Sequence, residues 1–152
     1  MGEKDGYLPI ERLEVFKLFV RCADRCWDAT DEDDHKAWDT FGKQLVRSSD
    51  SVCANILEGG HRGSDPDSNR FFVMARGSAA ETIYWLRRPT RQKRMPPDLA
   101  KSIVDDVRVG IRMLNKLIAH RNKRSKYVKE PMEPSYGIVD DLEALDAWNL
   151  DA

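Results

Sequence analysis

Residues Ser49–Glu81 read SDSVCANILEGGHRGSDPDSNRFFVMARGSAAE, and the predicted fold class rests mainly on this stretch. Its first part has apolar residues at helical spacing. Gly59 and Gly60 then predict the end of a helix, because a glycine at the C-cap can adopt the left-handed conformation. A polar loop follows, and a second helix is expected to begin at Asp67 or Ser68. Two helices joined by a short loop favour an all-α bundle, and nothing in the stretch has the pattern of a catalytic centre.

Apolar periodicity predicts four helices, over residues 10–30, 34–58, 67–88 and 97–126. The cationic segment that starts at Pro89 is expected to break the third helix, and Pro97 suits the first turn of the fourth. Short connections predict an antiparallel up-down four-helix bundle. The fourth helix is expected to have an apolar side and an opposite, basic side. The apolar side consists of Leu99, Ile103, Val107, Gly110, Leu114, Leu117 and Ile118, and the basic side of Lys101, Arg108, Arg112, Lys116, His120, Lys123 and Arg124. The first helix has one apolar line at Leu13, Phe16, Val20, Ala23 and Trp27 and a second at Val15, Leu18, Cys22 and Cys26.

The third helix is apolar on two sides. One arc is expected to face the core, with Phe71, Phe72, Ala75, Ser78, Ala79, Thr82, Ile83 and Leu86. A helix that is apolar nearly all round must be covered on both faces, and in a small bundle a second copy of the chain is the simplest cover. We therefore expect a homo-oligomer whose interface includes Met74, Gly77, Tyr84 and Trp85.

The composition is that of a single soluble domain. The chain has 152 residues, of which 41% are hydrophobic and 34% charged. No apolar run approaches the ~20 residues of a membrane span, and the first residues are too acidic for a signal peptide, so a cytoplasmic location is expected. We predict a bundle over residues 1–128 and an acidic C-terminal tail over residues 129–152.

Charge is strongly segregated along the chain. Residues 87–129 carry 14 basic and 3 acidic side chains, whereas residues 130–152 carry 7 acidic side chains and no basic one. A basic block favours RNA or DNA as a partner, since lysine and arginine contact phosphates. The candidate nucleic-acid-binding residues are Arg87, Arg88, Arg91, Lys93, Arg94, Lys101, Arg108, Arg112, Lys116, His120, Lys123, Arg124 and Lys126.

The acidic tail has two interpretations. Its composition fits a flexible terminus that does not pack. However, Ile138, Leu142, Leu145 and Trp148 recur at helical spacing among carboxylates. This pattern also fits a segment that docks on a basic helix of this protein or of a protein partner.

Two blocks inside the opening stretch resemble a known family. Asn55-Ile56-Leu57-Glu58-Gly59 is followed by Arg70-Phe71-Phe72 and by Ala75-Arg76-Gly77-Ser78, with Glu81 shortly after. In order and spacing these resemble the four-helix-bundle family of proteins encoded in intervening sequences of bacterial large-subunit ribosomal RNA. Leu57 replaces the family's usual alanine, and Gly60-His61 stands where an aromatic-glycine pair is usual. With Leu13–Leu18, the resemblance covers roughly residues 10–125.

The resemblance implies a bundle that closes into a ring, typically a pentamer, without enzymatic activity and with RNA as the suspected ligand. A related bundle is the accessory subunit of diversity-generating retroelements, where a basic pentamer binds nucleic acid and a reverse transcriptase. The resemblance also implies structural roles for the matching motif residues, Asn55, Glu58, Gly59, Arg76, Gly77, Ser78 and Glu81.

No cofactor or metal is predicted. Cys22, Cys26 and Cys53 fit buried free thiols, and no further ligand pair completes a zinc site near them. Glu58 and His61 have a metal-ligand spacing, but the two glycines between them disfavour a continuous helix. No nucleophile lies in a recognisable turn beside a histidine.

Three charged motif residues are expected to have structural partners. Arg76 and Glu81 should each form an ion pair at a helix or subunit contact. Glu58, near the negative end of a helix dipole, should have a cationic or N–H partner such as Arg62 or Arg76, or the first turn of the next helix. The functional prediction is a non-enzymatic protein that binds RNA or DNA. The alternative is a protein-interaction scaffold, or an accessory subunit of a nucleic-acid enzyme such as a reverse transcriptase.

Overall fold

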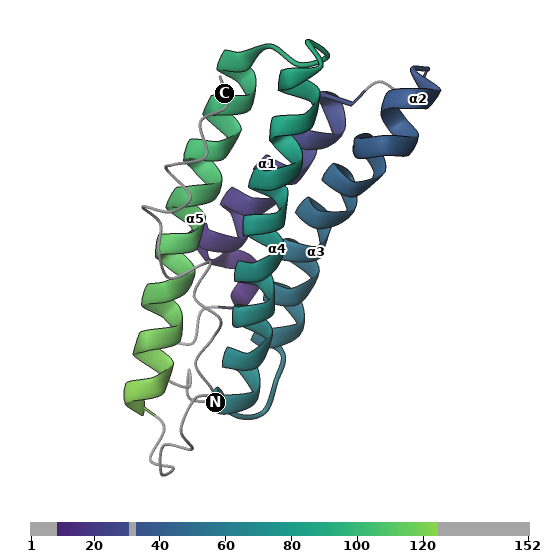
Figure 1. Cartoon of the computed structure of the whole chain (residues 1–152). Helices are drawn as coiled ribbons and strands as arrows, with labels where there is room; N and C mark the ends of the chain where they lie inside the picture. The colour runs from purple at the N-terminus through teal and green to yellow at the C-terminus, as the bar shows by residue number, and fades with distance from the viewer. Residues whose placement is uncertain (1–8, 31–32, 125–152) are drawn as a thin grey trace.

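The computed structural model describes residues 9–30 and 33–124, and these residues form helices and connections without any strand (Figure 1). The elements are η1 (Ile10–Arg12), α1 (Glu14–Asp28), α2 (His35–Ala37), η2 (Trp38–Gly42), α3 (Lys43–Gly60), α4 (Asp65–Arg91) and α5 (Pro97–Arg124). Because α2, η2 and α3 follow one another without a gap, they form one long helical segment. The prediction of an all-α fold with four packed helices is confirmed.

The first predicted helix is split at Leu13. A short 3₁₀ turn, η1, comes first, and Leu13 is extended before α1 begins. The second apolar line contributes most of the buried side of α1, which consists of Val15, Phe19, Cys22, Ala23 and Cys26. Trp27, the last residue of the first line, is 51% exposed and packs edge-on against Trp38 with ring centroids 6.2 Å apart.

The second helix ends at Gly60, two residues later than predicted, but the predicted glycine C-cap is wrong, because α3 includes both glycines and His61 is the C-cap. A Cβ on Gly60 would lie 2.4 Å from the Cβ of Ile10, and one on Gly59 would lie 2.8 Å from the Phe72 ring. These glycines therefore serve close packing rather than a left-handed cap. The same segment also contains a stretch that periodicity did not predict, since η2 is π-helical over five residues.

Pro89 was also wrongly predicted to break a helix. It lies inside α4, which continues to Arg91. Proline removes one hydrogen bond from a helix, and here this happens in the last turn. The Pro89 carbonyl accepts the backbone N–H of Arg94 at 2.7 Å, so the residue also anchors the connection to α5. Lys93, in that connection, has a positive φ of 54°.

The start of α4 is capped by its own sequence. Helix α4 begins at Asp65, two residues before the predicted start, and Ser64 is the N-cap whose hydroxyl accepts the N–H of Asp67 at 3.4 Å. Pro66 and two acidic residues occupy the first turn, where proline and negative charge suit a helix N-terminus.

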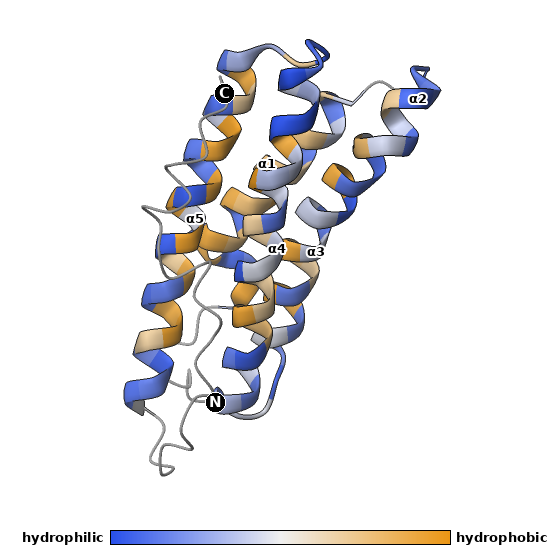
Figure 2. Ribbon diagram, in the orientation of Figure 1, coloured by the Kyte–Doolittle hydropathy of each residue, from blue (hydrophilic) through white to orange (hydrophobic). Residues whose placement is uncertain are grey.

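The core lies between the four long helical segments. Helix α1 packs on α3 and α5, and α4 packs on the same two helices. Helix α5 buries the predicted Ile103, Val107, Gly110, Leu114 and Ile118, whereas Leu99 and Leu117 are half-buried. Figure 2 shows the apolar sides of the helices turned inward and hydrophilic residues along the outside. Among the described residues, no helix is long and apolar enough to cross a membrane.

On α4, six of the eight predicted core residues are buried, while Phe71 and Ser78 are only half-buried. The predicted tail and the domain boundary at residues 128 and 129 lie outside the described residues.

Candidate nucleic-acid interface

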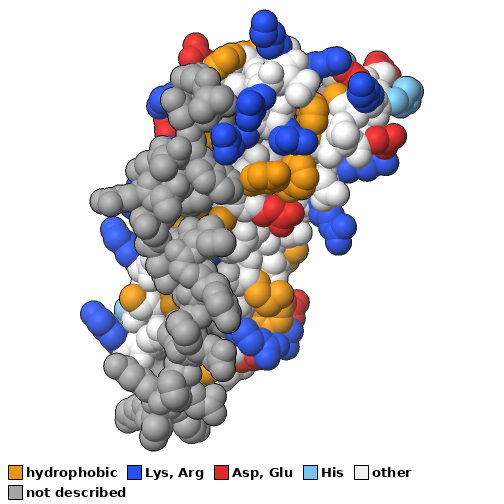
Figure 3. All heavy atoms as spheres, viewed as in Figure 1, with side chains coloured by type: hydrophobic (Ala, Val, Ile, Leu, Met, Phe, Trp, Pro, Cys, Tyr) orange, Lys and Arg blue, Asp and Glu red, His pale blue; other side chains and the backbone are white. Residues whose placement is uncertain are grey.

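Most of the predicted cations lie on the surface at the end of α4, in the α4–α5 connection and along α5. Figure 3 shows lysine and arginine side chains gathered around the end of the bundle where α4 meets α5. The exposed residues of the predicted set are Arg88, Arg91, Lys93, Arg94, Lys101, Arg112, Lys116, His120 and Lys123. Arg87 and Arg108 are half-buried. The Arg124 side chain and all of Lys126 lie outside the described part.

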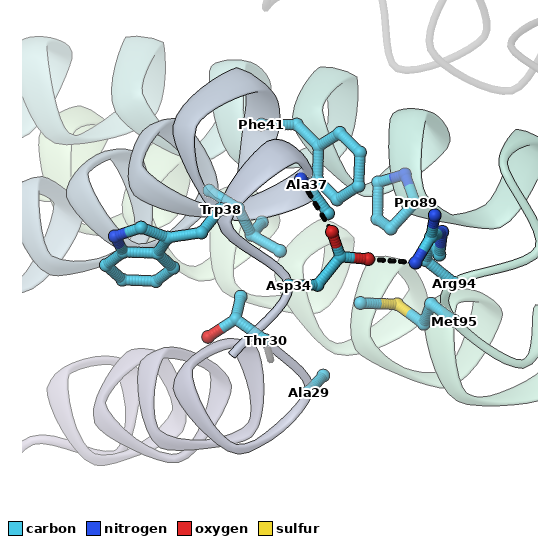
Figure 4. Close-up of a pocket in the computed structure, with 11 residues that line it drawn as sticks. Ala29, Thr30, Asp34, Ala37, Trp38, Phe41, Pro89, Arg94 and Met95 are labelled. Atoms are coloured by element: carbon cyan, nitrogen blue, oxygen red, sulfur yellow. Dashed lines mark hydrogen bonds and ion pairs between the residues drawn. The ribbon is translucent and has the colours of Figure 1, made fainter. Parts of the chain in front are cut away.

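Arg94 is held by a carboxylate. Its guanidinium forms an ion pair with Asp34, which also accepts the N–H of Ala37 at 3.1 Å and so caps α2 (Figure 4). The pair lies at a small hollow lined by Trp38, Phe41, Pro89, Met95 and neighbouring residues. Arg94 therefore joins the α1–α2 connection to the α4–α5 connection, and its charge is largely neutralised there.

Asp105 neutralises a second part of the basic stripe. The Lys101 ammonium lies 2.8 Å from one oxygen of Asp105, and the Arg108 guanidinium lies 3.7 Å from the other. The Arg108 side chain is only 18% exposed, so its prediction as an outward residue of α5 is wrong. The cause is its position on the side of α5 that faces α4, rather than on the outer side.

The remaining exposed cations define what we call the basic face: Arg88, Arg91, Lys93, Arg112, Lys116 and Lys123. Within the described ranges none of these six forms an ion pair. They come from three consecutive segments, namely the last turns of α4, the connection and the outer side of α5. A surface of this kind can contact several phosphates of one nucleic-acid strand.

Two other cations have structural roles that the sequence analysis did not identify. Arg121 lies 3.1 Å from Asp65 in a pair whose side chains are only 13% and 16% exposed, and its guanidinium also lies over the Phe72 ring. Arg25 on α1 binds Asp106 and Ser102 of α5, both at 2.8 Å. The Asp65–Arg121 pair could have been inferred from the sequence. Asp65 is at the start of α4 and Arg121 is in the last turn of α5, and these two ends meet when the helices are antiparallel neighbours.

The motif block on α3 packs against neighbouring elements. Glu58 pairs with Arg62 one turn later, so the predicted cationic partner is found. Asn55 donates to the Ser51 carbonyl at 2.9 Å, and Gly59 lies against Phe72.

The motif block on α4 contains a buried arginine. Arg76 is 7% exposed and donates to the Asn115 side-chain oxygen at 2.8 Å, so its identified partner across the helix contact is a neutral amide. Glu81 is exposed and accepts the indole N–H of Trp85 at 3.1 Å rather than pairing with a cation. The Thr82 hydroxyl lies 2.9 Å from the carbonyl oxygen of half-buried Ser78 and 3.1 Å from the Ser48 hydroxyl of α3, so it is within hydrogen-bond distance of both.

The predicted oligomer interface is a largely open surface of this chain. Met74 is 50% and Tyr84 38% exposed, while Trp85 is half-buried. A Cβ on Gly77 would meet nothing within 4 Å. Tyr84 and Trp85 pack edge-on with ring centres 4.9 Å apart. These residues form the outer side of α4, which we call the α4 outer face.

The titratable groups do not form a reactive centre in the described part. Burial raises the pKa of the Cys22 thiol to about 11 and those of Cys26 and Cys53 to about 12. No group of three or more His, Cys, Asp or Glu side chains that could hold a metal ion occurs among the described residues. His61 instead contacts Glu11 at 2.8 Å, and the pKa of Glu11 is lowered by a backbone hydrogen bond and by His61.

The fold and the site together define an all-α helical bundle with a segregated basic surface. The profile of the 23S rRNA-intervening sequence protein family matches residues 11–116. The chain therefore belongs to this family, which confirms the resemblance found in its motifs. No curated protein matches the chain at a significant level.

Proposed function

We propose that this protein is a non-enzymatic RNA- or DNA-binding protein of the cytoplasm that works as a ring of identical subunits. In this proposal the bundle is antiparallel and up-down, five copies close the ring through the α4 outer face, and the basic face of each copy contacts phosphates. The observation that carries it is the set of six exposed cations without ion pairs in the described part of the chain.

Repetition strengthens such a surface. One copy offers a few phosphate contacts, each of which is weak at physiological salt. A ring presents the same contacts several times to one strand, and the raised effective concentration allows weak contacts to combine. The family supports this proposal by its name, because its members are described as intervening-sequence proteins of 23S rRNA.

The test is a fluorescence-anisotropy titration of the full chain with a labelled single-stranded RNA, and with DNA of the same sequence. We expect the logarithm of the binding constant to fall linearly with the logarithm of salt between about 50 and 200 mM. The double variant Arg112→Glu/Lys116→Glu should bind about tenfold or more weakly, with a slope smaller by about 2, because two phosphate contacts are lost.

The matched control is Arg21→Glu/Arg47→Glu, which reverses two exposed cations on α1 and α3, outside the three segments that form the basic face. It changes the net charge equally and should bind more tightly than the α5 variant. Equal losses in both variants would mean that only net charge matters. Absence of binding at about 50 mM salt would reject nucleic acid as the ligand.

An exposed aromatic residue favours the second candidate function, a scaffold or accessory subunit of a nucleic-acid enzyme such as a reverse transcriptase. Trp27 is 51% exposed beside Trp38, and exposed tryptophans are enriched where proteins meet. Trp27→Ala should leave RNA binding unchanged, whereas under this alternative it should weaken capture of the partner protein.

A further inference from the structure

The seam between α4 and α5 has a well-defined register. Asn69 of α4 contacts Asn122 of α5 at 2.7 Å, and Arg76 contacts Asn115 at 2.8 Å. From the first contact to the second, the position on α4 rises by seven residues while that on α5 falls by seven. Repeating this step places Ile83 of α4 beside Arg108 of α5.

The side chains on the solvent-facing side of this seam are partly basic and partly apolar. Ala80, Tyr84 and Arg87 follow one another at steps of four and three residues along one side of α4, next to Ile83, and Arg112 lies one turn after Arg108 on α5. Tyr84 and Arg112 are exposed, while Ala80, Arg87 and Arg108 are half-buried. Positive charge is in excess at the seam, because Lys101 and Arg108 share the single carboxylate of Asp105 while Arg87 and Arg112 lie nearby. This charge, beside a tyrosine ring and a small side chain, suits an acidic segment with one apolar side.

The chain itself carries such a segment beyond α5. Residues 138–148 have apolar side chains at helical spacing in Ile138, Leu142, Leu145 and Trp148. Asp141 follows Ile138 by three residues and Asp146 follows Leu142 by four, so in a helix both carboxylates lie next to the apolar stripe. The segment has no basic residue.

The connecting chain is long enough for this contact. Thirteen residues separate Arg124 from Ile138, and an extended chain of that length spans about 40 Å. Arg108 lies 16 residues before Arg124 on one helix, at a distance of about 24 Å. Tethering also raises the effective concentration of the segment to the millimolar range, so modest ion pairs suffice for occupancy.

We propose that residues 138–148 dock as an amphipathic helix in the α4–α5 seam of the same subunit. The carboxylates contact Arg87, Arg108 and Arg112, and the apolar stripe covers Ala80 and Tyr84, which leaves Met74, Gly77 and Trp85 of the α4 outer face to a neighbouring subunit. Since Arg112 also belongs to the basic face, the docked segment competes with nucleic acid; this consequence, unlike the docking itself, rests on the proposed function.

The docking is tested in the full chain by carbodiimide coupling, which joins a lysine amine to a carboxylate in direct contact, followed by peptide mass spectrometry. We expect links from Asp141 or Asp146 to Lys101 or Lys116, the lysines of α5 that flank Arg108 and Arg112. The Lys43–Asp39 pair, at 2.6 Å, reports that the reaction has worked. Links from the segment to Lys17 and Lys36 at the same yield would overturn the proposal, as would the absence of any link to α5.

Mixing ordinary and ¹⁵N-labelled chains identifies the subunit that supplies the segment. Links within one isotope class support docking in the same subunit, whereas links mainly between the two classes overturn it in favour of a second copy. Leu142→Ser/Leu145→Ser should reduce the α5 links at least severalfold, since the apolar stripe is lost. Unchanged yields would overturn the assignment of that stripe to the seam.

Competition with nucleic acid is measured with two matched variants of the full chain. Asp141→Asn/Asp146→Asn should tighten RNA binding severalfold at low salt, while Glu130→Gln/Glu133→Gln removes two tail charges outside the segment and should change it less. Equal tightening by both variants would overturn competition by the docked segment. If no variant binds RNA or DNA, the proposed function fails, while the cross-links still decide the docking.

Discussion

Gly60 lies in close contact with Ile10, so it packs η1 against the end of α3. It lies within the last turn of α3 with Ile10 directly against its Cα. Any side chain there meets the Cβ of Ile10, close to the backbone, so relief requires movement of η1 rather than a change of rotamer.

We predict that Gly60→Ala lowers the free energy of unfolding by about 1–3 kcal/mol, the usual cost of overpacking, although alanine is the better helix former. Urea denaturation measures the change. Gly63→Ala is the control, because a Cβ on Gly63 meets nothing within 4 Å. The added substitution Ile10→Ala should restore part of the loss caused by Gly60→Ala. A neutral or stabilising effect of Gly60→Ala would show that η1 does not pack as described.

The cysteines make stability depend on alkaline pH. The ordinary thiol pKa is 9.0, and burial raises the pKa of Cys26 to about 12 and that of Cys22 to about 11. The unfolded chain therefore loses these protons at lower pH than the folded chain. The resulting contribution to stability is complete below pH 9 and is lost as pH rises toward 12.

Two measurements check this prediction. The urea midpoint should fall from pH 9 upward. At pH 8 the folded protein should react with a thiol reagent far more slowly than the urea-unfolded chain, because a thiol of pKa about 12 is only about 0.01% thiolate. Rapid reaction of Cys22, Cys26 and Cys53 in the folded protein would contradict the burial described for them.

At the scale of elements, the Asp65–Arg121 pair fixes the start of α4 to the end of α5. Both side chains are shielded from water, so removing the carboxylate leaves a guanidinium with poor solvation. Asp65→Asn should lower the free energy of unfolding by about 2 kcal/mol, between the values for exposed and fully buried pairs.

Asp67→Asn is a suitable control for that variant, since it removes a carboxylate from the same first turn of α4, where it lies 3.8 Å from Arg62 in a more exposed pair. Asp67→Asn therefore measures the effect of losing one carboxylate near the positive end of the helix dipole, without loss of the pair with Arg121. Removal of both partners in Asp65→Asn/Arg121→Gln should cost less than the sum of the single changes. If the Asp65 and Asp67 variants lose equal stability, the pair with Arg121 contributes nothing specific.

The helices could be predicted where a local pattern determines them. Helix α5 has an apolar stripe of regular period, and its buried residues Ile103, Val107 and Leu114 were all identified. The packing role of Gly60 could not be predicted, because it depends on Ile10, which is 50 residues earlier. The same limit applies to Pro89, whose place inside α4 depends on a connection that bonds to its carbonyl.

The candidate site was predicted less completely than the helices. The exposure of Arg112 and Lys116 follows from their helical period, and the structure places both on the surface. Arg94 and Arg108 look equivalent to them in the sequence, yet Asp34 and Asp105 neutralise these two. Asp34 is 60 residues from Arg94, and such long-range partners are not visible in composition or spacing.

For the whole molecule, the middle of the α4 outer face and the α5 half of the basic face lie on different helices. Met74 and Gly77 lie in the middle of α4, whereas Arg112, Lys116 and Lys123 lie on α5. A neighbouring subunit that covers the middle of α4 would therefore leave the α5 cations available. This separation is what a ring that both assembles and binds phosphates requires.

Assembly through α4 predicts a specific effect at Gly77. In the isolated chain an arginine at this position projects into open space, so Gly77→Arg should leave helix content and thermal unfolding of the subunit nearly unchanged. In a ring, the same side chain fills the space where a second copy approaches, and sedimentation velocity at micromolar concentration should show dissociation to monomers. Gly63→Arg, which adds the same charge at another open glycine, should leave the assembly intact.

The molecular mass of the wild-type protein is measured first. A monomeric mass at micromolar concentration would contradict assembly through α4. If the wild type is assembled and Gly77→Arg assembles equally well, the contact lies elsewhere, and Trp27 is then the strongest exposed apolar alternative among the described residues.

If Gly77→Arg is monomeric and still folded, its RNA affinity shows whether assembly contributes to RNA binding. Binding that depends on repetition should fall about tenfold or more with the assembly, although the basic face of each subunit is unaltered.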